Sequence, residues 1–457
     1  MTLQFGASAA DITPPSGLWM SGYAFRNECA TGVHDPLMAS VLVATNGARC
    51  VAIISLDLIS LPQDTVDRMR SEVSKSLGTT PEAIMVHCTH THGAPYTGIF
   101  RAMGERSPEY DDFLCMQVCT ISSNAAASVK PATMFYSQGP AQIGINRRCY
   151  DGNGVTLGQN PIGPMNPLVQ TFDIKELAGS RIAVGYSHAC HPTTMGGDNL
   201  EYTGDWMGAA ARAIQNRIST SPMQPVPVLS LQGCCGDVNP VRRGDWDAVE
   251  ANGRIVADAA LLALDYAGCS DDETLDFEET CVDLPLLREL NYSEALSLAG
   301  KWRAILAEDR EAGAPAGKLF YDQCHLDWAL DHLALAQTGN DDAVATFSIQ
   351  KITIGEVTFL GFPAELFISY QLDLQSRYKA PLFVLSYTNG CLNYLPAAAD
   401  YPFGGYEVRD ACRYYARPMF TAECEHIVRS TAYGLLGIDA STILPLPSAN
   451  HGQIPPA

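Results

Sequence analysis

Short apolar runs alternate with amphipathic stretches along most of the 457 residues. The apolar runs have the length of β-strands, and the stretches between them repeat with a helical period. Strands are expected at 51–58, 84–92, 133–143, 169–175, 181–189, 226–233, 344–355, 357–360 and 382–387. Helices are expected at 62–77, 110–129, 206–218, 247–266, 364–378 and 421–435. This alternation predicts an α/β fold with a mixed β-sheet core flanked by helices.

Neither repeats nor low-complexity linkers divide the chain, which predicts one domain over residues 1–446. Two amphipathic stretches at 291–308 and 319–337 predict a helical hairpin, inserted at about 288–340. The segment 151–167 is rich in Gly and Pro and is expected to be a long loop. Residues 447–457 form a Pro-rich tail that we expect to be extended.

The charge balance excludes several classes of partner. The chain has 29 Lys and Arg against 50 Asp and Glu, a formal net charge of −21. Binding to nucleic acid needs a basic surface, and an anionic membrane surface also attracts basic residues. We therefore expect neither nucleic acid nor a membrane as a partner. With 47% hydrophobic residues, the composition is that of a soluble globular protein.

The 15 cysteines are scattered and include no CxxC pair, which gives no support for a zinc ribbon or a thioredoxin-like site. The first fifteen residues contain neither a basic segment nor an apolar run of signal-peptide type. We expect most of these cysteines to be buried, reduced residues of a cytoplasmic protein.

Histidines gather at the ends of two expected strands. His90 and His92 follow one strand, and a period of two places them on the same face. His188 and His191 lie at the end of another strand and can supply a further ligand, because metal sites need three or four. His87 is oddly spaced from His90, and His188 from His191, which favours core or supporting positions for His87 and His188. The alternative is that all are ordinary hydrogen-bonded polar residues near strand ends.

Three further segments carry polar side chains at strand or helix ends. Asp237 and Asn239 lie in a Gly-rich turn after a strand, where Asp237 can orient a ligating histidine, although both are ordinary turn residues. Glu365 is expected in the first turn of a helix, where a carboxylate also stabilises the helix N-terminus. Tyr394 and Tyr406 lie in a Gly-rich segment after a strand.

Five motifs occur in order: His90-Thr-His92-Gly-Ala-Pro95, His191-Pro192, Gly236-Asp-Val-Asn-Pro240, Pro363-Ala-Glu365 and the tyrosines after Asn389. The opening segments Ala10-Asp-Ile-Thr-Pro-Pro15, Gly22-Tyr23 and Gly32-Val-His-Asp35-Pro36 add to them. Over about residues 6–436 the chain resembles the neutral/alkaline, non-lysosomal ceramidase family of zinc-dependent amidases. The resemblance implies a neutral-ceramidase-like catalytic domain of bacterial type, without the immunoglobulin-like C-terminal domain of secreted members.

The resemblance also implies roles for individual residues. The implied zinc ligands are His90, His191, Glu365 and Tyr394. His92 matches the proton-transfer histidine, Tyr406 a substrate-side tyrosine and Arg147 a residue that contacts the substrate. Asn239 stands where the family has a serine required for activity. Asparagine cannot act as a nucleophile, but its amide can donate a hydrogen bond to a carbonyl or oxyanion, so Asn239 stays among the catalytic and substrate-binding candidates.

These residues support three hypotheses. The first is a zinc-dependent hydrolase that cleaves an amide (C–N) bond of a small soluble substrate through a metal-activated water, with His92 as proton donor. The second is a zinc-dependent esterase or lactonase with the same site, which depends less on His92. The third is a non-catalytic binding protein on this fold. The sequence gives neither the substrate nor the oligomeric state, and it leaves Asp35, Asp57 and Asp205 as supporting, substrate-contacting or capping residues.

Overall fold

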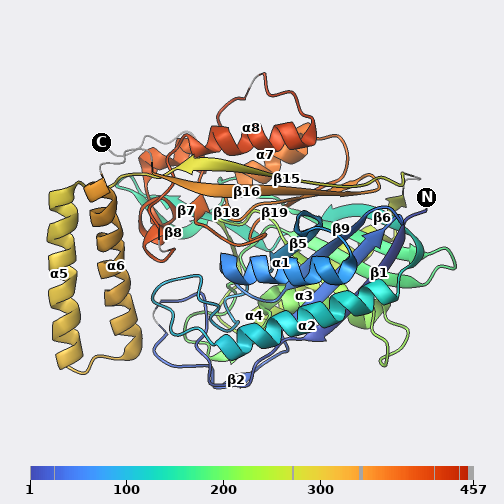
Figure 1. Ribbon diagram of the computed structural model, residues 1–457, viewed down its shortest axis with the longest axis horizontal. Helices are drawn as coiled ribbons and strands as arrows, with labels where there is room; N and C mark the ends of the chain where they lie inside the picture. Colours follow the sequence, from blue (N-terminus) through green and yellow to red (C-terminus); the bar gives the residue numbers. More distant parts are fainter. Residues whose placement is uncertain are drawn as a thin grey trace.

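Two groups of strands from the first 270 residues form one long, folded sheet (Figure 1). The structure is a computed structural model that describes residues 2–24, 26–269, 272–338, 343–415, 417–441 and 443–450. The strand order is β12 (Val228–Gln232), β10 (Arg181–His188), β9 (Leu168–Glu176), β6 (Lys130–Pro140), β1 (Gln4–Asp11), β3 (Met38–Thr45), β4 (Cys50–Leu56) and β5 (Ile84–Cys88). A short strand, β14 (Gly268–Cys269), also pairs with β6.

The two halves of this sheet face each other, because β12 contacts β3, β4 and β5. Helices cover the outside. Helices α1 (Gln63–Leu77) and α2 (Pro108–Ala127) cover the β1–β5 half, and α3 (Asp205–Ile218) and α4 (Trp246–Leu264) cover the β9–β12 half. Apolar side chains such as Phe5, Ile53 and Leu229 fill the space between the halves. The predicted α/β class with a mixed, helix-flanked sheet is confirmed.

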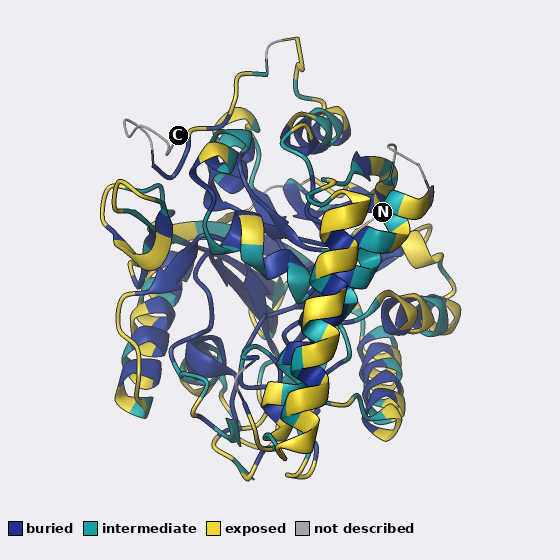
Figure 2. Cartoon of the chain, turned by 90° about the vertical axis from the view of Figure 1, so that its left-hand side faces the viewer, coloured by how far each residue is buried: buried dark blue, intermediate teal, exposed yellow. Residues whose placement is uncertain are grey.

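A second sheet is built from later residues, in the order β15 (Leu275–Pro285), β16 (Val344–Ile354), β17 (Val357–Gly361) and β19 (Leu382–Leu385). Helices α7 (Ile368–Arg377) and α8 (Cys424–Leu436) pack on it. Between β15 and β16 the chain forms α5 (Tyr292–Glu311) and α6 (Ala316–Thr338), two adjacent helices at the left of Figure 1. Exposed residues line the outer surface of these and the other helices, whereas the strands at the centre are buried (Figure 2).

Small sheets complete the fold near the strand ends. In one of them β7 (Gly144–Tyr150) pairs with both β13 (Val238–Pro240) and β8 (Val155–Asn160). The other two pair β18 (Glu365–Leu366) with β20 (Tyr394–Leu395), and β2 (Gly32–Val33) with β11 (Glu201–Tyr202). Short helical turns cover 81–83 (η1), 398–403 (η2), 406–410 (η3) and 411–413 (η4).

Local sequence explains where several helices begin. Ser107 accepts a hydrogen bond from the Tyr110 amide at the start of α2, and Asp245 accepts one from Ala248 at the start of α4. Asn291 and Glu294 form a reciprocal capping box at the start of α5. No described helix has both the length and the apolar content that a bilayer span requires. All 15 cysteines are free thiols.

Three expectations about elements are wrong. The helix expected at 364–378 begins only at Ile368, because residues 365–366 pair with β20 instead. The loop expected at 151–167 contains β8, which pairs with β7. The strand expected at 84–92 ends at Cys88, before both histidines. Within the predicted tail, the Ser448 hydroxyl donates to the buried Asp400, and residues 451–457 lie outside the described residues.

Candidate active site

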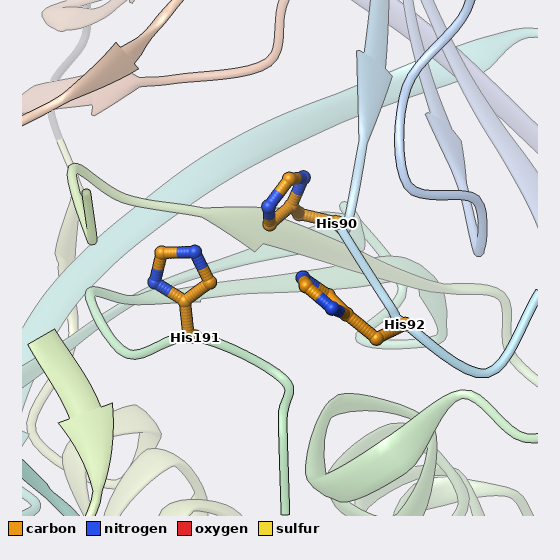
Figure 3. Close-up of side chains that lie close together, drawn as sticks. All are labelled: His90, His92 and His191. Carbon is orange, nitrogen blue, oxygen red and sulfur yellow. The ribbon is translucent and has the colours of Figure 1, made fainter. Parts of the chain in front are cut away.

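Three buried or half-buried histidines converge where the carboxyl ends of several strands meet (Figure 3). His90 and His92 follow β5, and His191 follows β10. The pairs β4–β5, β10–β12 and β17–β19 are parallel, so that their carboxyl ends face the same region. Ligand sites in α/β proteins form at such ends. The nitrogens of the three imidazoles lie within 4.8 Å of one another, a spacing that could hold a metal ion.

The two neighbouring histidines do not share a strand face, contrary to the period-two expectation. His90 has a φ of 66°, in the left-handed region that few non-glycine residues adopt. Two hydrogen bonds hold it there, from its amide to the Leu58 carbonyl and from its Nδ1 to the Ile59 carbonyl at 2.8 Å. The strained turn, and not strand geometry, brings His90 and His92 within 5.0 Å of each other, measured between ring centres.

Each imidazole is oriented by a backbone carbonyl. Nδ1 of His90 bonds to Ile59, Nδ1 of His92 to Gly22 at 3.1 Å, and Nδ1 of His191 to Cys235 at 2.5 Å. Because a carbonyl only accepts, each Nδ1 must carry a proton, so that Nε2 is the nitrogen with the lone pair whenever the imidazole is neutral. This is the arrangement that second partners give to metal-ligating histidines. Nε2 of His90 and of His92 is buried and has no hydrogen-bond partner among the described residues.

Burial controls the protonation of this cluster. Burial, with the Arg147 charge as a further cause, lowers the pKa of His191 to about 4. Burial and the neighbouring His90 and His191 lower the pKa of His92 well below its usual value. Both imidazoles are therefore neutral at pH 7, the form that binds metals.

Glu365 supplies a carboxylate to the same point. Its Oε2 lies 3.1 Å from Nε2 of His191 and 3.4 Å from Nε2 of His90. Burial opposes its charge, but the interactions with His90 and His191 outweigh burial and hold the pKa of Glu365 well below its usual value. Tyr387 donates to Oε2 at 3.1 Å, and Tyr415 donates to Oε1. Glu365 lies in β18, not in the expected helix turn, and this pairing places it opposite Tyr394.

Asp237, in the turn after β12, does not have the role that the sequence predicts. Asp237 does not orient His191, whose Nδ1 bonds to the Cys235 carbonyl. Asp237 instead accepts from the Ile368 amide at 2.7 Å and from the Asn146 side chain at 2.8 Å. It thereby ties the turn to the start of α7 and to β7. Burial raises the pKa of Asp237 to about 7.

Arg147 connects the remaining predicted residues. Its Nη1 donates to Oδ1 of Asn239 at 3.2 Å, and its Nη2 donates to the Tyr394 hydroxyl at 3.0 Å. Its Nε donates to Glu407 at 2.7 Å, within a buried ion pair. Burial disfavours its charge, but Tyr394 and Glu407 more than offset this and keep the pKa of Arg147 well above its usual value. The Tyr406 ring lies 5.9 Å from the Tyr394 ring.

These residues line a cavity of about 380 Å³. Its wall comprises Gly22, Tyr23, Ala24, His92, Met103, Ile145, Arg147, Leu157, Gly158, Gln159, Thr193, Asn239, Pro240, Arg243, Tyr394, Tyr406 and Tyr414. The structure thus brings together all the site residues expected from the sequence. His90, His191 and Glu365 are clustered at one end, and His92, Asn239, Arg147, Tyr394 and Tyr406 line the cavity.

The other polar residues singled out in the sequence support the framework. His87 bonds to the Thr388 hydroxyl and accepts from the Gln232 amide at 2.8 Å, and His188 bonds to the Leu168 carbonyl. Asp35 accepts from Thr203 and the Gly204 amide. Asp57 accepts a hydrogen bond from the Met38 amide. Asp205 accepts hydrogen bonds from the Met195 and Trp206 amides.

Sequence reasoning missed several contacts of the site. Tyr387 stacks on His90 with ring centres 3.8 Å apart, and Tyr415 holds Glu365. Glu407 neutralises Arg147, and Arg243 lines the cavity. Only Tyr23 carried a signal, because it lies in the Gly22-Tyr23 motif.

Three oriented imidazoles and a carboxylate, beside a cavity with both polar and apolar walls at strand ends, are typical of the active site of a metal-dependent hydrolase. Residues 3–253, more than half of the chain, match the family described as neutral/alkaline non-lysosomal ceramidase, N-terminal. The chain belongs to this family, whose members hydrolyse an amide bond.

Solved structures agree with this assignment at the level of the fold. The chain is similar to a crystal structure of neutral ceramidase from Pseudomonas aeruginosa, with 18% identity, a TM-score of 0.70, and coverage of 100% of this chain and 78% of the other. A structure described as a ceramidase complexed with C2 gives 15% identity, a TM-score of 0.71 and the same coverage. None of the curated proteins matches the chain.

Proposed function

We propose that the chain is a zinc-dependent hydrolase that cleaves the amide bond of a small soluble substrate. One observation carries the proposal. His90 and His191 present their Nε2 atoms to the Glu365 carboxylate, at 3.4 and 3.1 Å. Ligands about 2.0–2.1 Å from a tetrahedral zinc ion are separated by roughly 3.3 Å. The two imidazoles and the carboxylate therefore fit three corners of such a site, and the Tyr394 hydroxyl is the proposed fourth ligand.

A bound zinc ion would lower the pKa of a water molecule to about 7 and polarise the substrate carbonyl. The protein residues hold the ligands in place for this chemistry. The Tyr387 and Tyr415 hydroxyls fix the Glu365 carboxylate, and the Ile59 and Cys235 carbonyls fix the two imidazoles. Such supporting contacts affect metal affinity and activity by about 10–100-fold.

Hydrogen-bond donors face the cavity on the side of Arg147. Because Oδ1 of Asn239 accepts from Arg147, the asparagine NH₂ group is left to donate to a substrate oxygen. We infer that the Asn239 amide, with Arg147 and the Tyr406 hydroxyl, stabilises the negative charge that develops on the carbonyl oxygen. Asn239 thus serves as a donor where the family has a serine required for activity.

His92 is suited to proton transfer. Its Nδ1 proton is held by the Gly22 carbonyl, and its buried Nε2 has no partner among the described residues. The neutral Nε2 can take a proton from the attacking water and give it to the leaving nitrogen. An amine leaves poorly without that proton, so amide cleavage depends on His92 more than ester cleavage does.

The test is the hydrolysis of matched soluble amides and esters by the chain loaded with zinc. We expect His90→Ala and Glu365→Ala to lower kcat/KM by about 100-fold or more, since each removes a ligand. The exposed His426 on α8 supplies the control, and His426→Ala should keep full activity. If both ligand variants keep full hydrolysis and bind zinc, the assignment is wrong.

The same panel separates amidase from esterase or lactonase. Loss of amide cleavage in His92→Ala, with ester cleavage largely kept, supports the amidase. Ester cleavage by the wild type without any amide cleavage would replace the proposal with the esterase. Ligand-induced thermal shifts without turnover of either class would indicate a binding protein.

A further inference from the structure

The cavity beside His92 is positively charged in a strongly acidic protein. Arg147 and Arg243 lie among its lining residues, and within the described lining there is neither Asp nor Glu. The chain as a whole carries a net charge of −21. A cavity lined by arginines without acidic residues attracts anions and repels cations.

The two arginines differ in how their charge is balanced. Arg147 is paired with Glu407 at 2.7 Å, so that its charge is largely neutralised. Arg243 has no carboxylate within ion-pair distance in the described parts of the chain. The charge of Asp205 raises the pKa of Tyr23. The Asp205 carboxylate is buried and accepts hydrogen bonds from the Met195 and Trp206 amides. Arg243 therefore contributes an unpaired positive charge to the cavity wall.

Arg243 is held in a fixed loop between β13 and α4. Its Nε donates to the Thr193 carbonyl at 2.9 Å, and the next residue, Gly244, donates to the Thr194 carbonyl at 2.8 Å. The Asn252 side chain donates to the Arg242 carbonyl at 3.1 Å. A hydrogen bond also links the guanidinium to the Tyr23 side chain. The remaining N–H groups of the two terminal nitrogens can donate to a carboxylate.

A second unpaired cation lies behind the same wall. Arg26 is buried, and its guanidinium lies 5.0 Å from the centre of the Tyr23 ring. It donates to the carbonyls of Ser21 and His92, and it too has no carboxylate within ion-pair distance among the described residues. Burial raises the pKa of Tyr23, and the charge of Arg243 lowers it by a smaller amount. Tyr23 therefore lies between two uncompensated arginines.

Tyr23 and Arg243 lie on the same side of the cavity as His92, the proposed proton donor. The Tyr23 ring is 5.1 Å from the His92 ring, whereas Arg147, Asn239 and Tyr394 form a separate cluster around the proposed oxyanion position. In the proposed function, His92 protonates the leaving nitrogen. The part of the substrate next to Tyr23 and Arg243 is therefore the amine half.

We propose that the substrate is an N-acyl amino acid or a similar amide whose amine half carries a carboxylate, and that Arg243 binds this carboxylate. The inference rests on the proposed function. A cavity of about 380 Å³ is at the lower end of the range for small-molecule sites, which fits a compact substrate. Arg243 acts on specificity and does not take part in bond cleavage.

The experiment compares three soluble probes on the zinc-loaded chain. N-hexanoylglycine carries the carboxylate on the amine half, N-hexanoylglycinamide lacks the charge, and N-ethyladipamic acid carries the carboxylate on the acyl half. A hydrogen bond between charged groups corresponds to roughly 10- to 100-fold in kcat/KM, so N-hexanoylglycine should be preferred by that factor over the other two. The preference should appear mainly in KM and should weaken at high salt.

Substitutions at neighbouring positions provide the matched control. Arg243→Gln should bring the ratio of kcat/KM for N-hexanoylglycine and N-hexanoylglycinamide close to one, whereas Arg243→Lys should keep part of it. Arg242 is also exposed but does not line the cavity, so Arg242→Gln should keep the wild-type ratio. Because Arg243 is exposed, its replacement should leave the fold intact.

A binding measurement distinguishes failure of this inference from failure of the proposed function. Calorimetry without added zinc should show N-hexanoylglycine binding at least about 10-fold more tightly than its amide, and Arg243→Gln should remove the difference. If the amides are hydrolysed without a carboxylate preference, the inference is overturned and the amidase remains. Equal binding of both probes also overturns it. If no amide is hydrolysed but the binding preference is present, the proposed function fails and the carboxylate site stands.

Discussion

Two residues of the site have unusual backbone conformations. His90 and Tyr387 both have positive φ values, 66° and 53°, and their rings stack on each other. Such conformations cost about 1–3 kcal/mol each and persist only where the surroundings hold them. Here hydrogen bonds to Ile59 and Glu365 hold the two side chains. This local backbone strain lowers the stability of the fold, but it places the His90 imidazole beside the Glu365 carboxylate.

Asp57 gives a prediction at the residue scale. It is buried, and burial raises its pKa to about 7, with Asp35 as a further cause. Its folded-state pKa therefore lies above the value of about 3.9 in the unfolded chain. Between these values the folded chain binds a proton that the unfolded chain lacks. The contribution of Asp57 to stability is present at low pH and is lost as the pH rises from about 4 to 7.

Asp57→Asn keeps a neutral side chain that can still accept from the Met38 amide. Urea unfolding should therefore show the variant gaining stability relative to wild type as the pH rises from 4 to 8. The gain is at most about 1.4 kcal/mol per pH unit. A difference in unfolding free energy that stays flat, or that falls with pH, would contradict the raised pKa.

At the scale of elements, the two-residue strand β18 positions the carboxylate of Glu365. It is held on one side by β20 and on the other by the Gly236 amide, which donates to the Leu366 carbonyl at 2.9 Å. A Cβ atom at Gly236 would lie 2.8 Å from the carbonyl oxygens of Glu365 and Leu366. Only glycine allows the turn after β12 to approach β18 this closely.

We therefore expect Gly236→Ala to displace β18 and to lower kcat/KM by at least about 10-fold, because a displaced ligand loses its geometry. The free energy of unfolding should fall by about 1–3 kcal/mol, as for other overpacked sites. Gly154 is the control, since a Cβ there meets no atom within 4 Å. Wild-type turnover in Gly236→Ala, measured beside Gly154→Ala, would show that β18 does not depend on this contact.

Elements with strong periodicity could be predicted from the sequence, and those set by tertiary pairing could not. The apolar runs around Ile53 and Val86 identified β4 and β5 because burial on both faces leaves a continuous hydrophobic signal. The helix expected from residue 364 was wrong, because pairing with Tyr394 outweighs local preference at Glu365. The strand expected to carry His90 was also too long, since a positive φ leaves no trace in hydrophobic patterning.

The candidate site could also be predicted only in part from the sequence. Motif order predicted the cluster of His90, His191 and Glu365, and their roles stay predictions. Tyr415 comes from a segment without a motif, and Glu407 follows the motif residue Tyr406 without a signal of its own. Only the folded chain brings them to Glu365 and Arg147. Long-range contacts of this kind cannot be read from spacing in one sequence.

At the scale of the whole molecule, charge and topology act together. The folded sheet brings the carboxyl ends of its parallel strands to one place, and the later sheet adds Glu365 and Tyr387 to the histidines from the first half. The chain as a whole carries a net charge of −21, whereas the cavity presents arginines. This contrast favours a soluble, negatively charged substrate over a lipid in an anionic bilayer.

The most direct test of the metal centre is the number of zinc ions bound per chain, measured by calorimetric titration of the metal-free protein. The proposed ligand set predicts one zinc ion for wild type and for His92→Ala. It predicts binding at least about 100-fold weaker for His191→Ala and Glu365→Gln. If His92→Ala loses the zinc ion while Glu365→Gln keeps it, then the three histidines are the ligands, and the proposed separation of metal binding from proton transfer is wrong.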